Sequence, residues 1–209
     1  LARAEVVAVE AGFSAAHLSV DPTNAEAGDD TTTSTAADTT DNADTDESIP
    51  AVPADRPYEV QVPASYDESE PAPLLVVLHG YGATGAVQTA YLGLTDTAEA
   101  EGMLLVAPDG TVNAEDEGKQ FWNATEACCG GPDYSVDDSG YLRSVIAEVS
   151  TDYNVDANQI FLAGHSNGGF MSYRMACDHA DVIAGIVTIA GATYDDPDDC
   201  TPSEPVAVL

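Results

Sequence analysis

A serine stands between two glycines, at the spacing G-x-S-x-G, in the stretch Gly164-His165-Ser166-Asn167-Gly168. This spacing is typical of a nucleophile elbow, in which a strand, a very tight turn and a helix hold the serine in strained backbone geometry with its Oγ exposed. The flanking residues must be small, because side chains there would collide with the neighbouring strand or helix. Gly164 and Gly168 meet this need, and His165 takes the variable position. We therefore predict that Ser166 is a nucleophile rather than part of an ordinary glycine-rich turn.

A serine of this kind needs two N–H groups aimed at the oxyanion that develops during acyl transfer. One comes from the residue after the serine, which here is Asn167. The other comes from a loop after an earlier strand, and "LHGYGATG" follows the apolar run "LLVV", so we expect the Tyr81 amide to supply it. His79 lies at the end of that run, and we interpret it as ordering the loop rather than acting as the catalytic base.

The elbow requires a strand before it and a helix after it. Residues 160–163 are the strand candidate, and residues 170–180 have the pattern of the helix. Three more apolar runs, "PLLVVLHG", "GMLLVAPDG" and "VIAGIVTIAG", are typical of strands buried on both faces, "YEVQVP" alternates like a strand, and "PVAVL" begins one more. Between them "SGYLRSVIAEVSTDY" has a helical apolar face, with Asp137 and Asp138 near its start, where carboxylates suit the helix dipole. The alternation predicts an α/β fold with a mostly parallel sheet and helices on both faces.

Composition divides the 209 residues into two regions. Residues 1–57 include an acidic, Thr- and Asp-rich stretch without aromatic or positive residues from residue 28 to 48, and we expect an N-terminal disordered segment and linker. Residues 58–209 are expected to form the catalytic domain. The chain begins at Leu1 without a recognisable signal peptide, and no apolar run approaches the roughly 20 residues of a bilayer span. We interpret it as a piece of a longer protein.

The formal charge of −32 excludes nucleic acids and anionic membranes as partners, because such a surface repels phosphate. The charge is explained either as a means of solubility alone or as suited to a protein that functions in high salt, which screens the repulsion between the protein's own charges. Of the four cysteines, Cys177 and Cys200 flank an apolar strand candidate and are expected to pair. Cys128 and Cys129 are adjacent, closer than ordinary disulfide geometry prefers, and their pairing stays open. No second paired-ligand motif accompanies them, so we expect no metal and no cofactor.

Six stretches together resemble one known family: "LHGYG", "APDGT", "FWNATEACCG", "VDDSGYLRSVIAEV", "GHSNGGFMSYRMAC" and "IAGATY". The resemblance is to the polyhydroxybutyrate depolymerase and feruloyl esterase group of α/β-hydrolases, over residues 58–209. It implies a secreted, extracellular serine esterase that cleaves carboxylic esters through an acyl-enzyme, with Ser166 as nucleophile and with Tyr81 and Asn167 in the oxyanion hole. It also places Trp122 and Asn123 near the active-site mouth, although Trp122, the single tryptophan, could equally belong to the core.

The same family has its acid just after the strand that "PVAVL" begins and its histidine further downstream. We therefore expect a fold that is incomplete at the C-terminus, with both triad partners of Ser166 beyond Leu209. The resemblance implies a monomer acting on a polymeric or oligomeric ester: a polyhydroxyalkanoate, another polyester, or a feruloylated or acetylated polysaccharide. The alternatives are a serine peptidase or acyltransferase of the same fold, and an inactive hydrolase fold that serves as a binding module.

Overall fold

The structure, a computed structural model, describes residues 49–129 and 135–209. The expectation of a disordered acidic segment falls, for residues 1–48, outside this range. The described residues form a six-stranded sheet of order β1-β3-β2-β6-β7-β8, in which β1 runs antiparallel to β3 and the other neighbours are parallel. The strands are β1 Val60–Gln61, β2 Ala72–Leu78, β3 Leu104–Val106, β6 Val155–His165, β7 Gly185–Ile189 and β8 Ala207–Val208.

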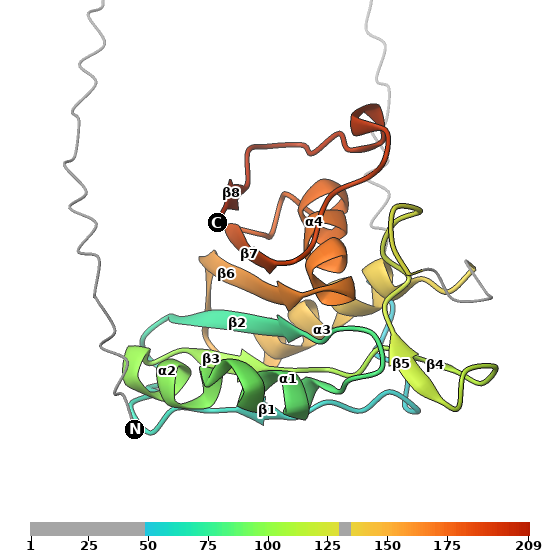
Figure 1. Ribbon diagram of the computed structural model, residues 1–209. Helices are drawn as coiled ribbons and strands as arrows, with labels where there is room; N and C mark the ends of the chain where they lie inside the picture. Colours follow the sequence, from blue (N-terminus) through green and yellow to red (C-terminus); the bar gives the residue numbers. More distant parts are fainter. Residues whose placement is uncertain (1–48, 130–134) are drawn as a thin grey trace, which may run out of the picture. The chain divides into compact units, whose positions relative to one another are not determined.

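Helices cover both faces of this sheet, as predicted (Figure 1). Successive side chains of a strand point to opposite faces, and β2 is buried on both. Leu74, Val76 and Leu78 pack in the larger cluster, which includes residues of α3 and α4. Leu75 and Val77 pack on the other face, in a cluster that includes α2 residues. The helices are α1 Gly85–Leu92, α2 Leu94–Glu101, α3 Asp138–Asp152 and α4 Asn167–Asp178, with a 3₁₀ turn at Pro197–Asp199.

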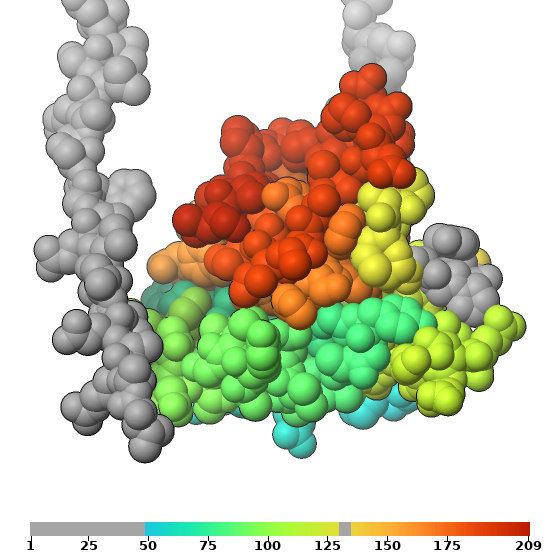
Figure 2. Space-filling view, viewed as in Figure 1, coloured from blue at the N-terminus to red at the C-terminus, as the bar shows by residue number. Residues whose placement is uncertain are grey.

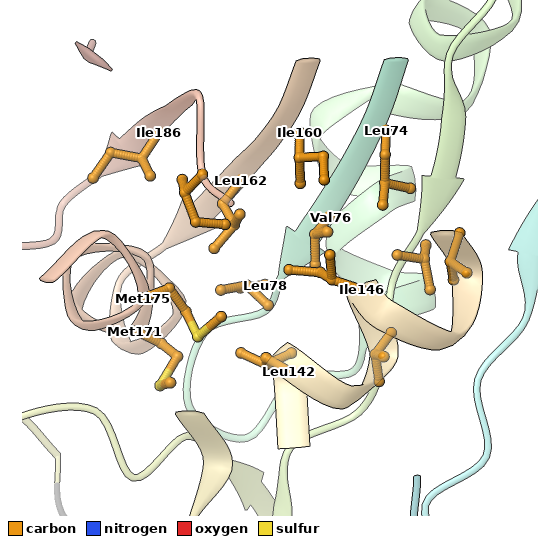
Figure 3. Close-up of a cluster of buried hydrophobic side chains, with 14 of the residues drawn as sticks. Leu74, Val76, Leu78, Leu142, Ile146, Ile160, Leu162, Met171, Met175 and Ile186 are labelled. Atoms are coloured by element: carbon orange, nitrogen blue, oxygen red, sulfur yellow. The ribbon is translucent and has the colours of Figure 1, made fainter. Parts of the chain in front are cut away.

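The larger cluster is the core that supports the elbow. Figure 3 shows Met171 and Met175 of α4 facing Leu142 of α3 and Leu78 of β2. All four side chains are fully buried. The α4 helix, which follows Ser166, is therefore held against β2 and α3 by buried apolar side chains. Figure 2 shows the surface of this unit, with the segments from α1 to β5 in green and yellow and those from α4 to β8 in orange and red.

The starts of α3 and α4 show where the sequence pattern predicted a helix boundary correctly and where it did not. Asp137 is the N-cap of α3 and accepts a hydrogen bond from the Gly140 amide at 2.8 Å, as a carboxylate at a helix start can. The α4 helix begins at Asn167, three residues before the expected start, because the elbow turns directly from strand to helix. Sequence reasoning also missed α1 and α2, two short helices that meet at Gly93 and lie on one face of the sheet.

A two-stranded hairpin, β4 Thr111–Asn113 and β5 Lys119–Phe121, was not predicted either. Its turn contains Glu117 and Gly118, both with positive φ. Figure 1 shows the hairpin at the side of the sheet toward which β2 and β6 point. The hairpin therefore lies at the carboxyl ends of the parallel strands, where ligands bind in open α/β sheets.

Packed residues begin before Tyr58, the expected domain boundary. The Arg56 guanidinium donates to Asp138 at 2.7 Å, lies 3.6 Å from the centre of the Tyr141 ring, and contacts the Asp109 carbonyl. Arg56 therefore packs against residues of the expected catalytic domain. Within the described part of the chain, no helix is both long and apolar enough to cross a bilayer.

Candidate active site

Ser166 lies between the last residue of β6 and the first residue of α4. Its φ of 53° and ψ of −119° are strained for a residue with a side chain. Three hydrogen bonds hold this conformation: the Ser166 amide donates to the Ile189 carbonyl at 2.8 Å, and the Ser166 carbonyl accepts from the amides of Gly169 and Phe170. The side chain is half-buried at the turn. This is the geometry that presents a serine hydroxyl as a nucleophile.

Neither glycine of the elbow has room for a side chain. A methyl group on Gly164 would lie 2.1 Å from the Gly168 carbonyl oxygen, and one on Gly168 would lie 2.2 Å from that of Leu78. Both obstacles are backbone atoms, which cannot turn away as a side chain can. A third close approach, between Gly169 and Gly191, brings the loop after β7 against the start of α4. The tight packing of backbone on backbone fixes where Ser166 sits.

The loop after β2 lies against the nucleophile. A methyl group on Gly80 would be 3.4 Å from Ser166 Cβ. Residues 80–83 form a turn closed by the Ala83 amide donating to the Gly80 carbonyl at 3.1 Å. Gly82 occupies the positive-φ position of this turn, with φ 74°.

The backbone amides of residues 80, 81 and 82 differ in whether they have a hydrogen-bond acceptor. The Gly80 amide donates to Gln88 Oε1 and the Gly82 amide donates to the Gln120 carbonyl. The Tyr81 amide, in contrast, has no hydrogen-bond acceptor within residues 49–129 and 135–209. The Asn167 amide is likewise free of an intrahelical acceptor, since it is the first residue of α4. Of these two amides, that of Asn167 follows the half-buried serine directly in the chain, and that of Tyr81 follows Gly80, which lies against Ser166. An oxyanion hole requires two N–H groups without another acceptor.

His79 orders this loop, as its position in the sequence suggested. Its Nε2 accepts from the Gly110 amide at 2.9 Å, and its Nδ1 donates to the Gly80 carbonyl at 2.8 Å. Burial lowers the pKa of His79 below its usual value, which favours the neutral ring that this pair of bonds needs. With both nitrogens occupied by backbone groups, His79 has none left to accept a proton from Ser166.

Trp122 connects the loop after β2 with the start of α4 through hydrogen bonds. Its backbone N–H and C=O are both bonded to the Asn167 side chain, at 2.6 and 2.9 Å, and its indole N–H donates to the His79 carbonyl at 3.0 Å. Trp122 is fully buried, and Asn123 is buried beside it. Of the two interpretations that the sequence left open, this burial favours a core role for Trp122, and it argues against substrate contact by either side chain.

The segment around Asn123 rests on a buried ion pair that the sequence pattern did not reveal. Asp138 is fully buried; its carboxylate accepts from Arg56, from the Asn123 amide at 2.7 Å and from the Thr111 hydroxyl at 2.9 Å. One feature of the sequence could have indicated this ion pair. The whole chain has only five basic residues, so few side chains could pair with a buried carboxylate. Arg56 escaped notice because it precedes the expected domain boundary.

The catalytic base is not found among the described residues. Ser166 Oγ makes no hydrogen bond within them. The His165 ring faces Tyr91 of α1, with the ring centres 6.0 Å apart. His179 lies at the end of α4, where its Nε2 is 3.0 Å from the hydroxyl of Ser139. The tight turn at Ser166 and the loop after β2 therefore lie together, and no histidine among residues 49–129 and 135–209 is hydrogen-bonded to Ser166.

A second grouping of serine, histidine and aspartate does occur, but its geometry does not suit catalysis. Ser139 donates its hydroxyl proton to Asp178 at 2.7 Å instead of to His179. Its side chain is buried inside the first turn of α3. A substrate carbonyl could not reach it, so we interpret the cluster as a link between α3 and the end of α4.

Both cysteine pairs are bonded. Cys177 and Cys200 form a disulfide with a Cα–Cα distance of 5.2 Å, which confirms the predicted pairing. Cys128 and Cys129 also form one, although their Cα atoms are only 3.7 Å apart and the usual range is about 4.4–6.8 Å. In the described part of the chain no group of three or more His, Cys, Asp and Glu side chains is placed to hold a metal ion.

Comparison with known proteins agrees with the fold. Feruloyl esterase D of Neurospora crassa is 26% identical over 149 residues, which cover 66% of this chain and 46% of the relative. "Putative esterase NocK" of Nocardia uniformis is 31% identical over 143 residues, 67% of this chain and 39% of the relative. The solved acetyl xylan esterase from Aspergillus awamori superposes with a TM-score of 0.50 at 16% identity, covering 75% of this chain and 55% of that one. The chain thus spans less than half the length of these two curated relatives.

The sequence model of one protein family, described as "Putative esterase", matches residues 49–195. That match covers more than half of the chain and includes the elbow, the turn at residues 80–83 and the hairpin between β4 and β5. The chain belongs to this esterase family and has the α/β-hydrolase fold.

Proposed function

We propose that this chain carries the nucleophile and the oxyanion hole of a serine esterase that hydrolyses carboxylic esters through an acyl-enzyme. The observation that carries the proposal is the position of Ser166 on a strained strand-to-helix turn, with the unpaired amides of Tyr81 and Asn167 beside it. A hydroxyl in this position can attack a carbonyl carbon while two N–H groups bind the oxygen that becomes negative.

In the proposed reaction Ser166 Oγ forms a bond to the ester carbonyl carbon and loses its proton to a base. The tetrahedral oxyanion is held by the two amides until the alcohol leaves, taking the proton from the base, and an acyl-enzyme remains. Water then attacks the acyl carbon while the same base accepts its proton, and the base returns that proton to Ser166 Oγ as the acyl–oxygen bond breaks, which releases the carboxylic acid and restores the serine. The base and the acid that orients it are expected from residues outside 49–129 and 135–209, because no histidine in those ranges is hydrogen-bonded to Ser166: His79 and His179 bond other groups, and the His165 ring lies near that of Tyr91.

The substrate class and the location of the enzyme are proposals of the same kind. Relatives named as feruloyl and acetyl xylan esterases support an ester of a plant polysaccharide, and the family resemblance of the sequence keeps polyesters such as polyhydroxyalkanoates in the set. Two disulfides support secretion, since disulfides persist in oxidising compartments. A strongly acidic surface makes a polyanionic substrate unfavourable and suits a neutral ester.

The test is hydrolysis by the full encoded polypeptide of four substrates: p-nitrophenyl acetate, methyl ferulate, hydroxybutyrate oligomers and an acyl p-nitroanilide. We expect turnover of the esters with little of the anilide, and we expect Ser166→Ala to leave only about 10³–10⁴-fold acceleration over water. The matched control is Ser172→Ala, six residues further along, where a buried serine donates to the Gly168 carbonyl. Retained ester turnover in Ser166→Ala, or faster cleavage of the anilide than of the esters, would contradict the proposal.

A further inference from the structure

The tip of the turn at residues 80–83 lies at the surface. Tyr81 is partly exposed, in contrast to His79 and Leu78 before it, which are fully buried. Yet the Tyr81 amide must keep a fixed position to bind an oxyanion, because an oxyanion hole works through donors that are already in place. The contacts of the Tyr81 side chain therefore matter for the geometry of its own backbone.

The Tyr81 hydroxyl is anchored on the hairpin formed by β4 and β5. It donates to Asp116 Oδ2 at 2.7 Å and accepts from Asn113 Nδ2 at 3.3 Å. The other oxygen of Asp116 accepts from Lys119 Nζ at 2.9 Å. These donors hold the pKa of Asp116 below its usual value, so the anchor is a carboxylate at neutral pH. A tyrosine with its ring near Phe121 and its hydroxyl fixed at one point has little freedom.

The backbone next to Tyr81 is tied to the same hairpin. The Gly82 amide donates to the Gln120 carbonyl at 2.7 Å, and the methylene groups of Lys119 lie against Gly82. Asp116 in turn is set by its own turn, in which its amide donates to the Asn113 carbonyl and its carbonyl accepts from the Lys119 amide. The hairpin therefore holds the turn at two points, the Tyr81 hydroxyl and the Gly82 amide.

We propose that Asp116 is a positioning residue for catalysis: through the Tyr81 hydroxyl it fixes the Tyr81 amide in the oxyanion hole. Lys119, the single lysine of the chain, offsets the negative charge that Asp116 would otherwise place near a developing oxyanion. The inference rests on the proposed function, because it assigns Asp116 a part in that same site. Asp116 does not touch the reacting atoms, and its effect passes through Tyr81.

The test compares Tyr81→Phe, Asp116→Ala and the double variant in the full encoded polypeptide, with p-nitrophenyl acetate as substrate. Losing an oxyanion donor altogether costs about 10²–10³-fold in kcat, so a donor that is only loosened should cost about tenfold. We expect that loss in kcat for Tyr81→Phe, with KM unchanged within about twofold and the melting temperature nearly unchanged. The double variant should be no slower than the slower single variant, because both remove one hydrogen bond.

The matched control is Tyr91→Phe, since the Tyr91 hydroxyl is exposed and makes no hydrogen bond with the described residues. Equal kcat for Tyr81→Phe and Tyr91→Phe, a change confined to KM, or additive losses in the double variant would overturn the inference. Amide hydrogen exchange of Gly82 gives a readout without turnover: Tyr81→Phe should speed it, and unchanged exchange would also overturn the inference. A wild-type protein that hydrolyses no ester would instead contradict the proposed function.

Discussion

The two arms of the candidate oxyanion hole are held in different ways. The Asn167 arm is fixed by backbone packed on backbone: Gly164 and Gly168 leave no space for a methyl group, and the Asn167 side chain is fully buried against Trp122. The Tyr81 arm is fixed by side chains at a partly exposed surface, through the Asp116 carboxylate and the hairpin. One arm depends on local backbone geometry and the other on contacts between segments about 35 residues apart in the chain.

This difference predicts how each arm fails. Overpacking a buried backbone contact forces the elbow itself to move, so stability and catalysis should fall together. Removing an exposed hydrogen bond leaves the fold intact and loosens one donor, so catalysis should fall with little loss of stability. The predictions that follow test this contrast, beginning with the largest expected effect.

Gly168→Ala should be the most damaging change. Its methyl group would overlap the Leu78 carbonyl, so we expect a loss of about 3 kcal/mol in the free energy of unfolding. A displacement of the elbow by about 1 Å can cost about 100-fold in rate, so kcat should fall at least that far. Urea unfolding and ester turnover measure both effects.

The control for Gly168→Ala is Gly93→Ala, at the junction of α1 and α2. Gly93 has a positive φ of 67°, which is unfavourable for alanine, but nothing lies within 4 Å of an added methyl group. It should cost only about 1–2 kcal/mol and leave kcat unchanged. If Gly93→Ala lost as much stability and kcat as Gly168→Ala, close packing at Gly168 would not explain the sensitivity of the elbow.

Trp122→Phe should weaken the support of the Tyr81 arm, and it leaves the backbone hydrogen bonds between Trp122 and the Asn167 side chain in place. It removes the N–H that reaches the buried His79 carbonyl, and an unsatisfied buried acceptor costs about 1–3 kcal/mol. Tyr66→Phe is the matched control, because it deletes an aromatic hydrogen bond, to the Asn154 amide, far from Ser166 in the fold. Thermal melting followed by circular dichroism should show that both variants are destabilised. Ester turnover should show a lower kcat only for Trp122→Phe. Equal kcat in the two variants would show that the Trp122 indole does not support the site.

Acidification should weaken the loop arm through His79. Burial lowers the pKa of His79 in the folded state below the usual 6.5, so the unfolded chain binds the proton more readily. The stabilising contribution is complete above about pH 6.5 and declines as pH falls through the lowered folded pKa. Unfolding followed in 1 M NaCl from pH 7.5 to 5 should show this decline, with a smaller slope in His79→Gln. His179 is shifted in the same direction and should leave part of the slope.

Added salt should give the smallest and most general effect. The chain has 37 acidic and five basic residues, and raising NaCl from 0.1 to 1 M shortens the Debye length from about 10 to 3 Å. Repulsion among unpaired carboxylates then weakens, and we expect the free energy of unfolding to rise by about 1 kcal/mol or more. Stability that fell with NaCl would show that the few surface ion pairs, worth about 0–1 kcal/mol each, outweigh this repulsion.

The parts of the site that could be predicted from sequence are those encoded by neighbouring residues. The G-x-S-x-G spacing after an apolar run indicated the turn at Ser166, because the glycines and the serine that share the close contact are at most four residues apart. The run "LLVV" before His79 indicated the loop for the same reason. Strand β8 was also expected, from "PVAVL", although only Ala207–Val208 pair with β7.

The parts that were missed depend on partners far apart in the chain. Arg56 and Asp138 are 82 residues apart, and nothing local indicates that a carboxylate at a helix start is buried in an ion pair. The hairpin has strands of three residues each, too short for an alternating pattern to show. The sequence left Trp122 either near the active-site mouth or in the core, and no local pattern indicates its hydrogen bonds to Asn167 and His79, which lie more than 40 residues away in the chain.

The central claim is that Ser166 is the nucleophile, and labelling of the full encoded polypeptide by a fluorophosphonate tests it most directly. Peptide mapping by mass spectrometry should locate one adduct, on Ser166, and Ser166→Ala should abolish it. Ser139, beside His179 and Asp178, is the internal comparison, and we expect it to stay unlabelled because it is buried and donates its proton to Asp178. An adduct on Ser139, or labelling that persists in Ser166→Ala, would contradict the account.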